Sequence, residues 1–489
     1  MLDELIATMR RHRDRPAILT AVRCGRPKVL ARNGELLDLA ERYAAALHHD
    51  GLTSGDTLGV AVRPGPRALS MLLAADRLGL RVAVIDPTAG PEVVAARLAL
   101  ARPALVVADS AAQAVAGWAR PLARRAGLAL PRLAALAPVR TVGPRLPGTA
   151  PPLTARSGPV PERNDQDGDF VIIFTSGTTS RPRAVVHTRS SLCAGMRLVA
   201  DLVRVRTGEP VLGGMFFVLV PALAGGAPVA LPARSPGLLA RQFARLRPQA
   251  SYLTPPQLRA LLARAPRLTG AVYSGSAPVS ATLLERVRRA GAGQAWGVYA
   301  LTELFPAAAV EAAEKSAYTG DGDLVGNLLP GVRARIDRDG QLLLTGANRS
   351  DRYLGEAPHD WVATGDIARL DGDRVVLAGR SKDMILRRAE NIYPGLYEPA
   401  LTVPGVDLAV LVGLPVEDGD ERLVAVIEPE PGADPRRIRR ALAPVLARMG
   451  AARPDELLFA RIPTAGRSRK PDRAAAAALA ARSLRGRLR

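Results

Sequence analysis

The chain is 489 residues long, which exceeds the size of one hydrophobic core and favours two or three domains. Its hydrophobic content of 48% and mean hydropathy of +0.06 are typical of globular proteins. With only Cys24 and Cys193, a disulfide scaffold and a cysteine-rich zinc site are excluded, and a reducing cytoplasm is the expected compartment.

The net charge of +21 comes almost wholly from arginine, since lysine occurs only at Lys28, Lys315, Lys382 and Lys470. The basic residues are spread along the chain and are not interleaved with aromatic residues, which make up 4% of it. We therefore expect no specific nucleic-acid binding. The arginine bias is typical of a GC-rich coding background; the functional alternative is a basic surface that receives an anionic partner.

One uncharged stretch, residues 210–233, has the length of a membrane span. It contains four prolines and two glycine pairs, which predict two buried strands or short helices joined by turns. The N-terminus is acidic and amphipathic, so we also expect no signal peptide. The sequence thus predicts no membrane span.

The first part of the chain alternates helical patterns with short β-rich runs. Helices are predicted over 37–48 and 68–78 and from Pro91, and strands over 57–62, 81–85 and 104–108. This alternation predicts a mostly parallel sheet with helices on both faces. Residues 111–164 are expected to form a loose helix and surface loops, after which the alternation resumes at Phe170 and continues to Tyr273.

A domain boundary is predicted near residue 380. Apparent strands at 341–344 and 374–377 precede it, and a short α+β pattern follows, ending in a basic, alanine-rich helix over 473–484. The prediction is a large N-terminal domain over 1–380 and a small domain over 381–489.

A buried strand predicted over 169–174 runs directly into a turn of hydroxyl residues and one glycine. The members of this turn are Thr175, Ser176, Gly177, Thr178 and Thr179. A tight turn at a strand end points backbone N–H groups outward, its hydroxyls can surround phosphate oxygens, and Arg183 can supply the compensating charge. The Walker pattern is not met. An ordinary surface loop is the alternative.

Two motifs follow in the large domain. Tyr299, Thr302 and Glu303 follow a strand-like run at 294–298 and combine an aromatic face for a base, a hydroxyl for phosphate and a carboxylate for a hard cation. The second motif consists of the small residues Ser274, Gly275 and Ser276. Small side chains allow backbone to approach a flat ring closely, although an ordinary strand-to-helix turn uses the same residues.

Three further motifs lie around and beyond the predicted boundary. Asp366 closes a Thr-Gly-Asp sequence, and its two acceptor oxygens suit a vicinal diol. Arg380 and Lys382 belong to the run 379–385, and Lys470 lies in the run 469–473 near the C-terminus. A basic tail is the alternative interpretation of Lys470, but lysine is so rare here that this position is notable.

Together with residues 184–188, the hydroxyl turn resembles the phosphate-binding signature of the adenylate-forming superfamily, which includes acyl-CoA synthetases, luciferases and the adenylation domains of nonribosomal peptide synthetases. The other motifs resemble the remaining signatures of this superfamily in the same order. The resemblance implies an α/β fold: a large N-terminal domain with mostly parallel sheets flanked by helices, and a small mobile α+β C-terminal domain.

The resemblance also implies a role for each motif. Tyr299 would stack on adenine next to the loop 274–276, Thr302 would lie near the α-phosphate, and Glu303 would hold Mg2+. Asp366 would accept the ribose hydroxyls and Arg380 would contact ribose or phosphate. Lys382 would be the hinge of the small domain, and Lys470 would bridge the carboxylate and the α-phosphate.

Six positions depart from the superfamily pattern. Ser180, Ala184, Ala300, Ala389 and Arg469 replace glycines, and Arg183 replaces a lysine. Arginine keeps the charge but presents a planar fork, so the geometry of phosphate binding can differ. Ala389 stands where a glycine commonly lines the path of pantetheine.

The function implied by the resemblance is ATP-dependent activation of a carboxylic acid as an acyl adenylate, with release of pyrophosphate and transfer to a thiol. CoA is the expected acceptor and Mg2+ the expected metal. The acid is expected to be hydrophobic, and the protein to be a monomer or a homodimer. Alternatives are transfer to the phosphopantetheine of an acidic carrier protein or to an amine, no second step, or a degenerate homologue that only binds nucleotide.

Overall fold

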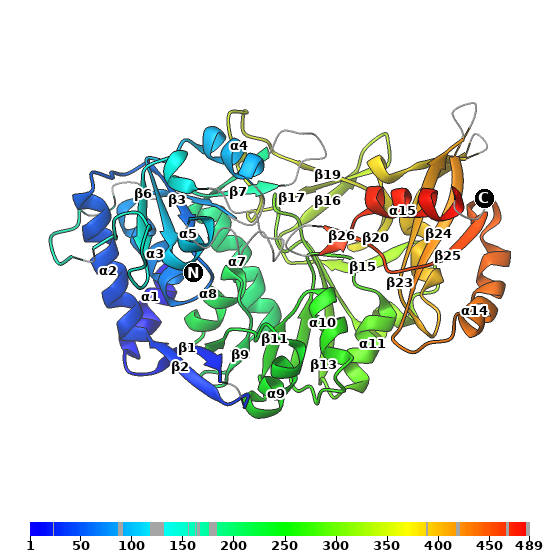
Figure 1. The fold of residues 1–489 in the computed structure, drawn as a ribbon, viewed down its shortest axis with the longest axis horizontal. Coiled ribbons are helices and arrows are strands. Elements are labelled where there is room, and N and C mark those ends of the chain that lie inside the picture. The colour runs from blue at the N-terminus through cyan, green and yellow to red at the C-terminus, as the bar shows by residue number, and fades with distance from the viewer. Residues whose placement is uncertain are drawn as a thin grey trace.

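The computed structural model describes residues 1–22, 24–86, 91–117, 132–154, 156–161, 163, 167–175, 183–387, 390–416, 421–465 and 469–485 (Figure 1). Two large sheets with flanking helices form the part up to Arg380. Smaller sheets form the C-terminal part, which lies at one end of the molecule and is coloured orange to red in Figure 1.

The first large sheet has seven strands in the order β18-β8-β7-β4-β3-β5-β6 among the described residues. Its strands are β3 (Thr57–Ala61), β4 (Arg81–Val84), β5 (Leu105–Asp109), β6 (Val139–Val142), β7 (Asp169–Thr175), β8 (Arg183–Thr188) and β18 (Arg352–Tyr353). Strands β3 to β7 pair in parallel, whereas β8 pairs antiparallel with β7 and β18. Helices of this part are α2 (Asn33–His49), α3 (Pro66–Leu78), α4 (Pro91–Ala101) and α5 (Ser110–Ala116), with a 3-10 turn η2 (Leu133–Ala135).

The second large sheet has thirteen described strands in the order β16-β17-β19-β20-β15-β14-β13-β12-β11-β9-β10-β1-β2. Their bounds are β1 (Pro16–Ala21), β2 (Pro27–Arg32), β9 (Val211–Leu212), β10 (Val229–Ala230), β11 (Ala250–Tyr252), β12 (Ala271–Ser274), β13 (Gln294–Tyr299), β14 (Ala308–Glu311), β15 (Asp323–Leu328), β16 (Arg333–Ile336), β17 (Gln341–Thr345), β19 (Val362–Asp371) and β20 (Arg374–Arg380). Its helices are α1 (Leu2–Arg11), α7 (Arg189–Val203), α8 (Phe216–Ala224), α9 (Pro236–Leu246), α10 (Pro255–Leu262), α11 (Ala281–Arg289) and α12 (Ala312–Ala317).

The C-terminal part is built around the sheet β23-β24-β25 and carries its own hydrophobic clusters. Its strands are β21 (Ile385–Arg387), β22 (Glu390–Ile392), β23 (Val406–Pro415), β24 (Glu421–Pro429), β25 (Glu456–Phe459), β26 (Thr464–Ala465) and β27 (Lys470–Pro471). Its helices are α13 (Pro394–Tyr397), α14 (Pro435–Arg448) and α15 (Arg473–Arg485), with the 3-10 turns η3 (Ser381–Asp383), η4 (Glu398–Leu401) and η6 (Gly450–Ala452). Clusters confined to residues 385–484 are what a separately packed unit requires.

The expected α/β class is confirmed, with one refinement. Strands β9 to β13 pair in parallel, but from β13 onward the large sheet is antiparallel. The parallel strands are joined through helices, whereas short Gly/Asp turns such as 371–374 join β19 to β20 directly, and a short connection can only produce an antiparallel pair.

The predicted helices and strands of the first 110 residues are confirmed to within a few residues at their ends. Strand β6 was not predicted, because four residues between prolines and glycines show too short a pattern. The uncharged stretch 210–233 forms β9, α8 and β10, as its prolines and glycines indicated. Within the described part of the chain, no helix has both the length and the apolar character of a membrane span.

Gly326 tests how tightly the second sheet is packed. A Cβ atom there would lie 1.9 Å from the carbonyl oxygen of Ala309, and the φ angle of +98° belongs to a region that favours glycine. Gly326→Ala should therefore lower the free energy of unfolding by about 2–5 kcal/mol, measured by urea unfolding. Gly340→Ala is the matched control, because its φ is +79° but the nearest atom to a Cβ is 3.6 Å away; it should cost about 1–2 kcal/mol. Equal losses would contradict the proposed backbone clash.

Candidate active site

The predicted functional residues meet in one large cleft between the two big sheets and the C-terminal part. Its volume is about 3650 Å³, well above the roughly 300–1000 Å³ of a site for one small ligand. Ten of the described residues with predicted roles line it: Thr175, Arg183, Ser276, Tyr299, Thr302, Glu303, Asp366, Arg380, Lys382 and Lys470. The cleft can therefore hold more than one substrate.

The two ends of the hydroxyl turn lie side by side at this cleft. Thr175 ends β7 and pairs in antiparallel register with Arg183, the first residue of β8. Phe170 and Ile172, which anchor β7, are fully buried, as predicted for this strand. Ser176, Gly177, Thr178 and Thr179 lie outside the described residues, as does Ser180.

The guanidinium group of Arg183 lies over the ring of Tyr353, with its central carbon 3.5 Å from the ring centroid. It also forms an ion pair with Glu356, at 3.4 Å. About half of each charged side chain is exposed, so the ion pair contributes little to stability.

The segment Thr302–Glu303 follows β13 and is held from two other elements. Buried His187 of β8 donates a hydrogen bond from Nε2 to the carbonyl oxygen of Thr302, at 2.7 Å. The Ser350 amide donates to the carbonyl oxygen of Glu303 at 2.6 Å, and the Tyr353 hydroxyl donates to the Glu303 carboxylate at 2.9 Å. Burial lowers the pKa of His187, so the ring stays neutral and serves as a fixed donor.

Asp366 is almost fully buried and accepts hydrogen bonds at both carboxylate oxygens. Arg380, its partner across the β19–β20 pair, donates from Nε at 2.9 Å, and the Tyr299 hydroxyl donates at 2.5 Å. Burial, followed by the charge of Asp366, raises the pKa of Tyr299 well above its ordinary value. The phenol is therefore a permanent donor, and the Tyr299 ring lines the cleft.

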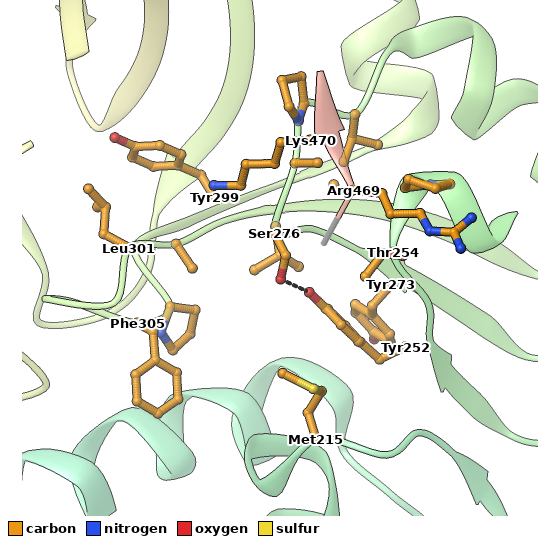
Figure 2. A pocket seen from close by; sticks show the side chains of 18 of the residues that line it. Met215, Tyr252, Thr254, Tyr273, Ser276, Tyr299, Leu301, Phe305, Arg469 and Lys470 are labelled. Carbon is orange, nitrogen blue, oxygen red and sulfur yellow. Dashed lines mark hydrogen bonds between the residues drawn. The ribbon is translucent and has the colours of Figure 1, made fainter. Parts of the chain in front are cut away.

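Lys470, on β27, extends toward Tyr299 in the cleft, whereas its neighbour Arg469 points to the opposite side (Figure 2). Solvent still reaches the Lys470 side chain, but the surrounding protein lowers the pKa of its ammonium group, and the charges of Arg380 and Lys382 lower it further. Arg469 has a φ of +47°, a left-handed conformation, which gives a physical reason for a glycine at this position in the superfamily pattern.

Arg473 fixes the segment that carries Lys470 to the C-terminal part. Its guanidinium group makes a two-pronged ion pair with Glu398, at 2.5 and 2.7 Å. It also pairs with Asp383 of η3 at 3.2 Å and donates to the carbonyl oxygen of Leu411 at 2.9 Å. A fork held this way has little freedom, so Lys470 is positioned relative to η3 and β23.

The wall beside Lys470 is formed by aromatic and aliphatic side chains (Figure 2). Met215, Leu301 and Phe305 line it, and the hydroxyl groups of Tyr252 and Ser276 are 2.8 Å apart. Phe217 packs edge-on against Tyr252, with ring centroids 5.0 Å apart.

The small-residue loop packs closely against β13. A Cβ atom on Gly275 would lie 2.7 Å from the carbonyl oxygen of Val298, so only glycine fits there. Ser276 reaches the cleft with a left-handed φ of +66°, whereas the side chain of Ser274 is fully buried.

Three contributors to the site were not found from the sequence: His187, Tyr353 and Tyr252. His187 gave a weak signal, as a histidine within the apolar strand that leaves the phosphate turn. Tyr353 and Tyr252 gave none, because they reach the site only through the pairing of β18 with β8 and of β11 with β12.

Known proteins resemble this chain in both sequence and fold. Indoleacetate–CoA ligase of Aromatoleum aromaticum is 27% identical over 459 residues, covering 81% of this chain and 83% of that protein. The fatty acid–[acyl-carrier-protein] ligase ScoC of Streptomyces coeruleorubidus is 29% identical over 332 residues, covering 59% of this chain and 63% of that protein. Among solved structures, the amide bond synthetase McbA from Marinactinospora thermotolerans superposes with a TM-score of 0.76 at 22% identity, covering 97% and 99% of the two chains.

The family match covers most of the large part of the molecule. Residues 7–348 match the family described as AMP-binding enzyme, and this range contains the hydroxyl turn and the Thr302–Glu303 segment. The chain belongs to the AMP-binding enzyme family, and thus to the adenylate-forming superfamily that its motifs resemble.

Proposed function

We propose that this AMP-forming acid ligase activates a hydrophobic carboxylic acid with ATP and transfers the acyl group to the thiol of CoA. The observation that carries the proposal is the meeting of Glu303, the Asp366–Arg380 pair and Lys470 in one cleft, although they lie far apart in the sequence. These are the charged groups that binding a metal-bound triphosphate, a ribose and a carboxylate requires.

In the first step a carboxylate oxygen attacks the α-phosphorus of ATP, and the bond from that phosphorus to the bridging oxygen breaks, so that pyrophosphate leaves. Lys470 would offset the charge as the two anions approach, and Thr302 would donate to the α-phosphate. Arg183, with Thr175 and the hydroxyl turn, would bind the departing pyrophosphate. Asp366 would accept the ribose hydroxyls while Arg380 holds its carboxylate.

Glu303 is the residue proposed to hold Mg2+. One of its carboxylate oxygens accepts from Tyr353, and within the described residues the other accepts no hydrogen bond. A single carboxylate suits Mg2+, which binds one or two carboxylates together with phosphate oxygens and water. When bound there, the ion would neutralise phosphate charge.

The chemistry of the acid is proposed from the wall beside Lys470. Its side chains are mostly aromatic or aliphatic, and the Tyr252–Ser276 hydroxyl pair and Thr254 are its polar groups. This lining favours an uncharged, ring-bearing acid over an amino acid, whose ammonium would need a carboxylate partner. Indoleacetate, named in one relative, is an acid of this kind.

For the second step, we propose that residues 381–489 are a domain that turns about Lys382. Lys382 lies exposed in η3, immediately after the last strand of the large sheet. Ion pairs hold the present arrangement: Arg286 contacts Asp407 at 3.3 Å and Glu430 at 2.8 Å. Such polar contacts can exchange for water, as a rotating interface requires.

The acceptor has two alternatives that specific observations favour. One relative is a ligase for an acyl-carrier protein, and the basic surface would suit an acidic carrier protein. One structural neighbour forms amide bonds. Ala389, expected near the pantetheine path, lies outside the described residues. A cytoplasmic location agrees with the two free cysteines.

Exchange of labelled pyrophosphate into ATP tests the first step. With a panel of fatty, aryl and amino acids, we expect exchange with hydrophobic ring-bearing acids and at least about tenfold less with amino acids. Product mass with CoA, a carrier protein or an amine would then identify the acceptor. ATP binding without exchange for any acid would reject adenylation in favour of a degenerate homologue.

Lys470→Ala should reduce exchange by about 10²–10³-fold, the loss typical of removing one electrostatic group from a reacting site. Thioester formation from a supplied acyl adenylate should be nearly unchanged, because Lys470 is assigned to the first step only. Lys28→Ala is the matched control, since Lys28 is exposed on β2, and it should change neither step. Equal loss of both steps in Lys470→Ala would contradict the assignment.

The pH dependence of exchange should also report Lys470. Its cationic form is present below its pKa, and that pKa is lowered by the surrounding protein, so the charge is lost at a lower pH than in an ordinary lysine. We expect kcat/KM to fall on the alkaline side and the fall to shift to higher pH in Lys470→Arg, whose guanidinium group stays charged. If kcat/KM falls at the same alkaline pH in the wild-type protein and in Lys470→Arg, the fall is caused by the titration of another group.

A further inference from the structure

Residues of strand β8 connect the phosphate turn, the Thr302–Glu303 segment and strand β18. Its first residue, Arg183, is the cation at the end of the phosphate turn, and His187 in the same strand holds the carbonyl oxygen of Thr302. On its outer edge β8 pairs with the short strand β18, which places Tyr353 opposite Val185. The phosphate turn and the Thr302–Glu303 segment are thus attached to one strand.

Tyr353 makes a different contact on each side of its side chain. The ring face lies under the Arg183 guanidinium group, at 3.5 Å, and the hydroxyl donates to the Glu303 carboxylate at 2.9 Å. One rigid side chain therefore touches both the phosphate cation and the metal carboxylate.

The backbone that carries Tyr353 is itself fixed. Arg352 makes a two-pronged ion pair with Asp169 at the start of β7, at 2.6 and 2.9 Å. The amide of Leu354 donates to the carbonyl oxygen of Ala184, at 2.8 Å. The backbone of Tyr353 therefore cannot shift with a movement of Glu303 or Arg183, and its side chain restrains the positions of both.

The contact also gives a physical account of arginine at position 183. A guanidinium group can stack with its face on a ring while its N–H donors point sideways, whereas a compact ammonium cannot do both as well. The N–H donors at the edge of the Arg183 guanidinium group form an exposed ion pair with Glu356. A phosphate could take the place of Glu356 at a small cost in free energy, because exposed ion pairs are weak. The stacked face would remain on Tyr353 during this exchange.

We propose that Tyr353 is a positioning residue that couples Arg183 to Glu303, so that the phosphate cation and the metal carboxylate are held at a fixed separation. The inference rests on the proposed adenylation reaction and assigns Tyr353 no part in bond making. It predicts that loss of the Tyr353 hydroxyl raises the metal requirement, and that loss of the whole ring also weakens nucleotide affinity.

The test uses the full chain and four variants: Tyr353→Phe, Tyr353→Leu, Arg183→Lys and the double variant Tyr353→Leu/Arg183→Lys. Tyr353→Phe keeps the ring under Arg183 but removes the bond to Glu303. It should raise the Mg2+ concentration for half-maximal exchange about tenfold, as expected for one hydrogen bond to a charged group, with little change in the KM for ATP.

The double variant isolates the coupling. Arg183→Lys alone should raise the Kd for ATP, measured by calorimetry at saturating Mg2+, about three- to fivefold through loss of the ring contact. In the Tyr353→Leu background the same change should add less than about twofold, because the ring contact is already gone. Additive effects, or an unchanged Mg2+ requirement in Tyr353→Phe, would overturn the coupling.

A second arginine–aromatic pair provides the matched control. Arg335 lies over the ring of Trp361 at 4.3 Å, and neither residue lines the large cleft. Arg335→Lys and Trp361→Leu should leave Mg2+ requirement and ATP affinity unchanged. If Tyr353→Leu does not fold, the Mg2+ requirement of Tyr353→Phe decides whether the coupling holds, because this variant retains the ring.

The outcomes separate this inference from the proposed function. Wild-type protein that binds MgATP and exchanges pyrophosphate, with Tyr353 variants that behave like the Trp361 control, overturns the coupling and leaves adenylation intact. Wild-type protein that neither binds MgATP nor exchanges pyrophosphate overturns both. A raised metal requirement in Tyr353→Phe and a joint shift of metal requirement and nucleotide affinity in Tyr353→Leu, both at unchanged thermal stability, support the coupling.

Discussion

The ion pair between Asp366 and Arg380 is the interaction on which the cleft depends. A carboxylate buried this deeply would be costly alone, so the Arg380 guanidinium and the Tyr299 hydroxyl are needed to stabilise its charge. Arg380 is also the last residue of the large sheet before η3. The same contact therefore fixes the position of the proposed ribose acceptor, Asp366, and the position at which the chain enters the C-terminal part.

The charges around this pair are arranged to receive an anion. Burial lowers the pKa of the Lys470 ammonium, the charges of Arg380 and Lys382 lower it further, and the charges of Asp366 and Glu303 act in the opposite direction. A triphosphate and a carboxylate entering the cleft would bring negative charge close to this ammonium group. Bound anions would thus stabilise the Lys470 ammonium, which is one way to favour the charged reacting complex over the free enzyme.

The sequence predicted the parts of the fold that depend on local pattern. Alternating apolar runs identified β3, β4 and β5, and the rarity of lysine drew attention to Lys470. The pattern could not reveal Tyr353 or Tyr252, because each reaches the site through strand pairing, which for Tyr353 joins segments far apart in the chain. Nor could it predict that Ser274 is buried while Ser276 reaches the cleft, since that depends on a left-handed residue at Ser276.

The anchoring of Arg473 has a consequence for the direction of the reaction. Because its fork ties the Lys470 segment to Glu398 and Asp383, the lysine must travel with the C-terminal part when that part turns as proposed. The movement that admits a thiol would withdraw the charge needed to rejoin pyrophosphate to the adenylate. The ion pairs of Arg473 would then couple the two steps: the movement that allows thioester formation would at the same time prevent the reverse reaction to ATP.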